Sequence, residues 1–187
     1  MIDSFERLIS PRVKNSTFSC IRCGACCKFS EIILSNREIE AISNHINIPV
    51  QEFKEKYLIK KQIHKVRRIF SHKFEIQGDF FIMKKDDQKL CPFSQNMNQK
   101  TSCQIYHFRP IVCRLFPFSW KTSKYNPQSI SVAIDFSENG WKECPGINQK
   151  NGKSWDDLRD EVTGAVVLSI IQSNELISGG FLTQQPK

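Results

Sequence analysis

The chain has 187 residues, of which 40% are hydrophobic and 25% are charged, a balance that is ordinary for a globular protein with its own hydrophobic core. Its formal net charge of +8 permits contact with nucleic acid or with acidic proteins but does not demonstrate it. The longest nearly apolar run, residues 165–171, is far too short to cross a membrane, so we expect no membrane partner.

The N-terminal region indicates the compartment. Residues 1–19 are mixed and polar and predict a short leading arm. Their charged side chains leave no apolar stretch of the length found in signal peptides. We therefore expect a cytoplasmic protein. In a reducing cytosol, eight cysteines indicate metal ligands more than disulfides.

The cysteines are distributed very unevenly along the chain. Half of them lie in residues 20–27, here called the cysteine cluster: Cys20, Cys23, Cys26 and Cys27. The other half are isolated and far downstream: Cys91, Cys103, Cys113 and Cys144. A dense group with remote single cysteines is what a site needs when it gathers ligands from distant segments. We predict all eight as metal ligands, with Gly24 supplying the tight backbone angles that close spacing demands.

Two helices are predicted after the cysteine cluster. Ser35 and Glu38 have the spacing of a capping box, which predicts a helix that starts at Ser35 and carries Ile39, Ile42 and Ile46 on one face. Pro49 then predicts the start of a second helix, which ends near Lys60.

Strands and loops follow. Residues 30–34 predict a short strand, and residues 65–77 and 79–84, rich in Phe and Ile, predict two strands that turn at Gly78. Residues 94–102 are mostly Ser, Gln and Asn and predict an exposed loop between two ligands. Two prolines in residues 103–118 exclude a long regular helix there. Apolar and polar residues alternate over residues 129–136, which predicts another strand.

A single domain over residues 1–187 is expected, with a metal-binding core over residues 18–146. Ser154 and Asp157 begin a last helix, residues 154–174, whose apolar side covers the core. We predict an α+β fold, a small domain in which short strands and cysteine-bearing loops surround a metal centre and helices pack outside.

Thiolate ligands suit both zinc and iron–sulfur clusters, so the ligand type alone does not choose between them. The C-x2-C-x2-C spacing from Cys20 to Cys26 resembles the run that binds one 4Fe–4S cluster in bacterial ferredoxins, where the fourth ligand precedes proline. Cys91 and Cys144 each precede proline. Zinc modules more often have two separated C-x2-C pairs, and a second pair is absent. The spacing is compatible both with one metal site plus spare thiols and with two metal sites of four thiols each.

Other candidate groups are weaker. Arg109 and Arg114 adjoin cysteines and could donate hydrogen bonds to cluster sulfurs or offset thiolate charge, and a structural ion pair is an equal alternative. His107 could reach a metal. The basic stretch at Lys65, Arg67, Arg68 and Lys73 is explained by a solvated strand face.

These motifs together resemble the YkgJ-type cysteine-cluster family, a zinc- or iron-chelating domain with a CxxCxxCC signature. The resemblance rests on the cysteine cluster, on Cys91-Pro92-Phe93, and on C-x-I-Y-x2-R-P-x2-C-R-x-F-P over residues 103–117. It implies metal chelation by the seven cysteines up to Cys113, and Cys144 fits the motif less specifically.

We therefore expect a metal-binding protein that holds an iron–sulfur cluster or zinc. One alternative is a zinc-stabilised adaptor that contacts nucleic acid or an acidic protein. Another is a metal-dependent redox or protein-modification enzyme, since related domains occur within flagellin lysine methylases.

Overall fold

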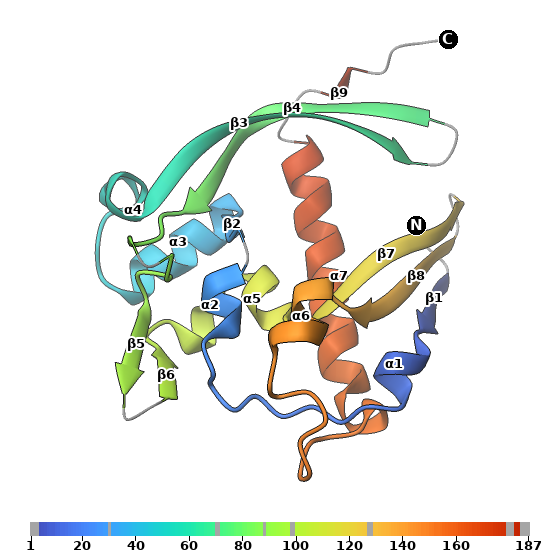
Figure 1. Ribbon diagram of the computed structural model, residues 1–187. Helices are drawn as coiled ribbons and strands as arrows, with labels where there is room; N and C mark the ends of the chain where they lie inside the picture. The colour runs from blue at the N-terminus through green and yellow to red at the C-terminus, as the bar shows by residue number, and fades with distance from the viewer. Residues whose placement is uncertain are drawn as a thin grey trace.

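Two hydrophobic clusters organise the chain, and they meet at one short helix. Figure 1 shows the arrangement of the helices and strands that carry them. The computed structural model describes residues 4–29, 31–69, 72–87, 89–97, 100–126, 129–178 and 182–183. The fold is mixed, with short strands and several helices in one small domain, as the sequence predicts. None of the helices described there is long and apolar enough to cross a membrane.

The first cluster lies between a three-stranded sheet and the last helix. The sheet has the order β1-β8-β7, formed by Ser4–Ile9, Ser129–Phe136 and Phe118–Asn126. Strand β1 pairs with β8 in parallel, and β7 pairs with β8 antiparallel. The expected leading arm is therefore wrong, because residues 4–9 form an edge strand of this sheet. The prediction of strand β8 is confirmed.

Helices complete this half of the molecule. Helix α7 (Trp155–Ser178) packs four apolar side chains into the first cluster, namely Leu158, Val162, Ala165 and Val166. Ser154 and the Asp157 carboxylate bond each other across the first turn of α7, with Ser154 Oγ donating at 2.7 Å. Two short helices, α1 (Pro11–Lys14) and α6 (Glu138–Glu143), follow β1 and β8.

The second cluster lies under a long hairpin. Strands β3 (Leu58–Ile69) and β4 (His72–Met83) pair antiparallel, and β2 (Ile33–Leu34) and β9 (Leu182–Thr183) both pair with β4. The predicted turn at Gly78 is wrong, because Gly78 pairs with Ile63 in the middle of the hairpin. A single glycine weakens a strand without ending it, and the pairing continues on both sides.

Helices α3 (Asn36–His45) and α4 (Val50–Tyr57) cover this second cluster. The predicted capping box is present: Glu38 N donates to Ser35 Oγ at 3.3 Å, and Ser35 N donates to the Glu38 carboxylate at 2.8 Å. Ile39 and Ile42 are fully buried on the face that was expected. These boundaries follow from local side-chain chemistry.

The segments that carry the later cysteines are short. Strands β5 (Ser94–Met97) and β6 (Lys100–Cys103) form a small hairpin, so the exposed loop expected over residues 94–102 is wrong. A 3-10 turn, η1 (Tyr106–Phe108), and helix α5 (Ile111–Leu115) come next. Helix α2 (Ala25–Phe29) carries the end of the cysteine cluster.

Helix α5 joins the two clusters. Its Ile111 and Leu115 side chains belong to the first cluster, whereas Val112 and Cys113 pack against the second. Glu38 of α3 anchors the start of α5, since its carboxylate accepts a hydrogen bond from Ile111 N at 2.7 Å. The position of Cys113 therefore depends on both halves of the fold.

Candidate metal centre

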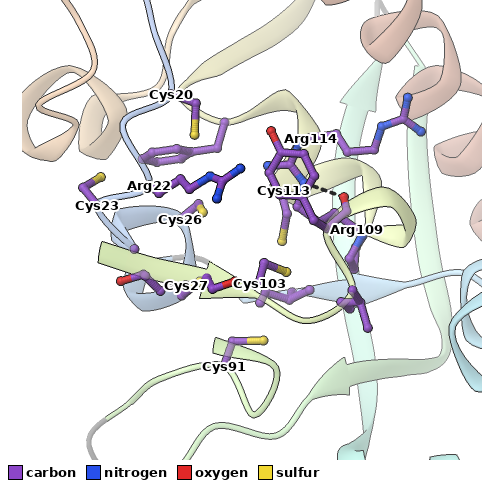
Figure 2. Close-up of a pocket in the computed structure, with 18 of the residues that line it drawn as sticks. Cys20, Arg22, Cys23, Cys26, Cys27, Cys91, Cys103, Arg109, Cys113 and Arg114 are labelled. Atoms are coloured by element: carbon purple, nitrogen blue, oxygen red, sulfur yellow. Dashed lines mark hydrogen bonds between the residues drawn. The ribbon is translucent and has the colours of Figure 1, made fainter. Parts of the chain in front are cut away.

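One cavity of about 250 Å³ is lined by all eight cysteines (Figure 2). They come from five separate parts of the chain: the loop before α2, α2 itself, the β5–β6 hairpin with the residues just before it, α5, and the loop after α6. None of them forms a disulfide. The fold thus brings the cysteine cluster and the four remote cysteines to a single place.

The backbone of the cysteine cluster is locked against β6. Arg22 and Gly24 both have positive φ angles, of 58° and 76°. The Arg22 carbonyl accepts a hydrogen bond from Thr101 N at 2.8 Å. A Cβ atom added to Gly24 would lie 2.5 Å from Thr101 Oγ1, so only glycine lets the two segments approach this closely. This contact fixes the turn that delivers Cys26 and Cys27 to the cavity.

Five cysteines form an inner group, defined here as Cys26, Cys27, Cys91, Cys103 and Cys113. All five belong to the second hydrophobic cluster or pack against it. The register of the small hairpin sets Cys103 opposite Ser94, and Ser94 N donates to the Cys91 carbonyl at 2.9 Å. In the view of Figure 2, the side chains of Cys26, Cys103 and Cys113 lie together at the centre of the cavity.

The other three cysteines form an outer group, Cys20, Cys23 and Cys144. Cys20 and Cys23 are exposed, and Cys144 is half-buried. The segment before Cys20 is tied to the loop after Cys144, because Ser19 N donates to the Gly146 carbonyl at 2.9 Å. A Cβ atom at Gly146 would lie 2.4 Å from the Ser19 carbonyl oxygen, so this approach also requires glycine.

The surroundings raise the pKa of five thiols of the cavity, which favours their protonated form. Burial raises the pKa of Cys91 to about 11 and that of Cys144 to about 11. Burial likewise raises the pKa of Cys103, and it holds that of Cys113 well above its ordinary value. A hydrogen bond with Cys27, followed by burial, raises the pKa of Cys26. A cation must therefore displace protons to bind here, as thiolate-binding metals do.

Arginine side chains supply positive charge to the same cavity. Arg109 lies over the Tyr106 ring, with Cζ 3.8 Å from the centroid, and its Nε donates to the Tyr106 carbonyl at 3.0 Å. Its charge favours the thiolate forms of Cys26 and Cys103, in opposition to burial. Arg114 is exposed and also lines the cavity. Both arginines thus line the same cavity as the thiols, and hydrogen bonds from them to a cluster stay a prediction.

Sequence reasoning missed three further residues of the cavity. Arg22 lines it, with Cζ 5.8 Å from the centroid of the Tyr106 ring, and Glu161 of α7 lines it from another side. Arg22 had a visible signal, because it is the charged residue inside the cysteine cluster. Tyr106 also had a signal, because it belongs to the C-x-I-Y-x2-R-P motif, whereas Glu161 had none, since only the fold brings it here. His107, which the sequence treats as a weak candidate donor, lines the cavity as well.

The donor chemistry fits a soft metal, because eight thiols share one partly buried space. In the described part of the chain, no three His, Cys, Asp or Glu side chains are already arranged to hold a metal ion. The side chains of the basic stretch at Lys65, Arg67, Arg68 and Lys73 lie outside what the structure describes.

Comparison with known proteins identifies the region that carries the site. The CxxCxxCC family model, described as a "putative zinc- or iron-chelating domain", matches residues 19–145. Among curated proteins, the chain is 24% identical over 140 residues to "Uncharacterized protein MJ0661" of Methanocaldococcus jannaschii, a match that covers 75% of this chain. It covers 63% of that relative, so this chain spans less than two thirds of the relative's length. No solved structure matches significantly.

Proposed function

The chain belongs to the CxxCxxCC family of zinc- or iron-chelating domains, and from that premise we propose that its cysteine thiolates bind an iron–sulfur cluster or zinc inside the cavity. The observation that supports this most is the convergence of all eight cysteines on one space of about 250 Å³. Free thiols scattered through a core as small apolar side chains would have no reason to converge in this way.

The spacing of Cys20, Cys23 and Cys26 favours an iron–sulfur cluster of the 4Fe–4S type, and zinc is the alternative. A cluster would supply one-electron transfer, and zinc would supply a structural crosslink. Either group needs thiolates, so a reducing compartment such as the cytosol suits the protein.

The chain's own residues have definite tasks in binding. The thiols of the inner group give up their protons, and the Arg109 guanidinium offsets part of the negative charge that then develops. Tyr106 holds that guanidinium in place through its ring face and its carbonyl. Phe53 and Phe93, which belong to the same hydrophobic cluster, keep water away from the buried side of the inner group.

Elemental analysis of protein purified without oxygen tests the proposal. We expect iron with acid-labile sulfide and a brown colour, or zinc without colour, in near-stoichiometric amount. Titration of native protein should find most thiols protected, and denaturant with chelator should release all eight. Protein that contains no metal and has eight freely reactive thiols would refute the proposal.

A further inference from the structure

The eight cysteines do not share one environment, and the division follows whether or not they pack with the second hydrophobic cluster. Cys27 and Cys91 are only 8% and 7% exposed, and the whole inner group packs in or against the second hydrophobic cluster. Cys20 and Cys23 are exposed, and no member of the outer group belongs to that cluster. A metal held by the inner thiols would be screened from solvent, whereas one held by the outer thiols would face it.

The two groups are also held by different parts of the fold. The inner group depends on the β5–β6 register and on α5, which Glu38 anchors. The outer group depends on the contact between Ser19 and Gly146 and on the bridge between Phe18 and Ile147. Each group therefore has contacts of its own, and the two share the contact between Gly24 and Thr101, which lies between Cys23 and Cys26 in the sequence.

The number of donors differs in a way that matters chemically. The inner group has five thiols and can complete a four-coordinate site. Cys113 interacts electrostatically with Cys26, Cys91 and Cys103, so these four thiols lie near one another. The outer group has three. Four protein ligands make a closed, structural site, whereas three leave a position for an exchangeable ligand.

We infer that the cavity contains two metal centres, a closed inner one on Cys26, Cys91, Cys103 and Cys113, and an open outer one on Cys20, Cys23 and Cys144 that exchanges its metal with the surroundings. This inference rests on the proposed function in its zinc form, because it divides the C-x2-C-x2-C run between two sites, whereas a single 4Fe–4S cluster would use Cys20, Cys23 and Cys26 together. In the view of Figure 2, the side chain of Arg22 is drawn between those of Cys20 and Cys26, and Arg22 lines the same cavity.

Zinc loading of the full chain without oxygen, followed by transfer to a colorimetric chelator in excess, tests the inference. Wild-type protein should bind two equivalents and release them in two phases, the first faster by about tenfold or more, equivalent to roughly 1.4 kcal/mol in the barrier. Cys20→Ser and Cys144→Ser should each lose one equivalent and the fast phase, and keep the slow phase. Cys103→Ser should lose the slow phase.

Binding of one equivalent, or loss of both phases in Cys20→Ser, would overturn the inference but leave the proposed function intact. Absence of any zinc binding would overturn both. If Cys103→Ser does not fold, alkylation of wild-type protein after the fast phase replaces it. Cys20, Cys23 and Cys144 should then react while Cys26, Cys91, Cys103 and Cys113 stay protected, and uniform labelling would contradict two centres.

Discussion

The carboxylate of Glu38 accepts a hydrogen bond from the backbone amide of Ile111 at 2.7 Å, across 73 residues of sequence. The same carboxylate caps its own helix through Ser35 and accepts a hydrogen bond from Gln172 of α7. One side chain thus connects α3, α5 and α7. Because α5 carries Cys113, Glu38 positions a predicted metal ligand without touching it.

Glu38→Ala should lower the free energy of unfolding by about 2–4 kcal/mol, because it removes a helix cap and the charged acceptor of a backbone amide. It should also weaken metal binding, because α5 loses its anchor. Glu40→Ala is the matched control, since Glu40 is exposed on the same helix. Chemical denaturation and metal titration measure both effects, and equal stability of the two variants would contradict the role of Glu38.

Gly24→Ala should disturb the cysteine cluster. The new Cβ would meet Thr101 at 2.5 Å on a backbone with φ of 76°, so we expect a loss of about 1–3 kcal/mol together with reduced metal content. Gly164→Ala in α7 is the control, because no atom lies within 4 Å of its added Cβ. That control should gain about 0.5–1 kcal/mol from helix propensity. A stable Gly24→Ala protein with full metal content would show that the close approach to Thr101 is not required.

Removal of the metal should lower the melting temperature, because the cavity exists only in the folded chain. A metal at about 100 times its dissociation constant adds roughly 2.7 kcal/mol, or about 5–10 °C for a protein of this size. Calorimetry with and without chelator, under reducing anaerobic conditions, measures the shift. The double variant Cys91→Ser, Cys103→Ser should respond much less to chelator. The same response in both proteins would place the metal elsewhere.

Alkaline pH should destabilise the metal-free protein. The folded state raises the pKa of Cys91 from its ordinary value of 9.0 to about 11, so the native chain retains a proton that the unfolded chain loses. The stabilising effect is complete below about pH 9 and disappears as the pH rises toward 11. Urea titrations of wild-type protein and Cys91→Ala over this range isolate the effect by difference, because lysines and tyrosines titrate in both. Parallel curves would contradict the raised pKa.

Metal affinity should change in the opposite direction. Each bound thiolate releases one proton, so affinity should increase with pH up to the pKa values of the free thiols. Competition with a chelator between pH 6 and 8, corrected for the chelator's own protonation, measures the slope. A flat profile would mean that the ligands are not these thiols.

Local features of the fold could be predicted from the sequence. The starts of α3 and α7 follow from Ser35 with Glu38 and from Ser154 with Asp157, because a cap is formed by residues three apart. The alternation of residues 129–136 likewise indicates β8. Each of these signals is contained within a few residues, so no knowledge of distant partners is needed.

Features set by pairing between distant segments could not be predicted. The β3–β4 register places Gly78 opposite Ile63, so a residue that marks a turn in isolation lies inside a strand. Taken alone, residues 4–9 are predicted as part of a polar arm, and only the parallel pairing with β8 makes them a strand. In both cases the stabilising hydrogen bonds are made to a strand that is distant in the sequence, so the local sequence does not predict them.

The candidate site divides in the same way. The eight cysteines could be predicted as a set, because their number and spacing are visible in the sequence. Their division could not, since Cys26 lies only three residues from Cys23 yet packs with Cys91, Cys103 and Cys113. The placement of Cys26 depends on the turn at Gly24 and on its contact with Thr101 of β6. Neither the cysteine cluster nor β6 predicts that contact by itself.

The parallel ladder between β1 and β8 has a consequence for the newly made protein. Ribosomes add about 5–20 residues per second. Roughly 6–25 s therefore pass between the synthesis of β1 with the first four cysteines and the synthesis of β8 with Cys144. During that interval β1 lacks its partner strand β8, and the four thiols of the cysteine cluster lack the thiol of Cys144. A metal site that uses Cys144 can therefore be completed only after synthesis has passed that residue, whereas the three-stranded sheet can close as soon as β8 has been made.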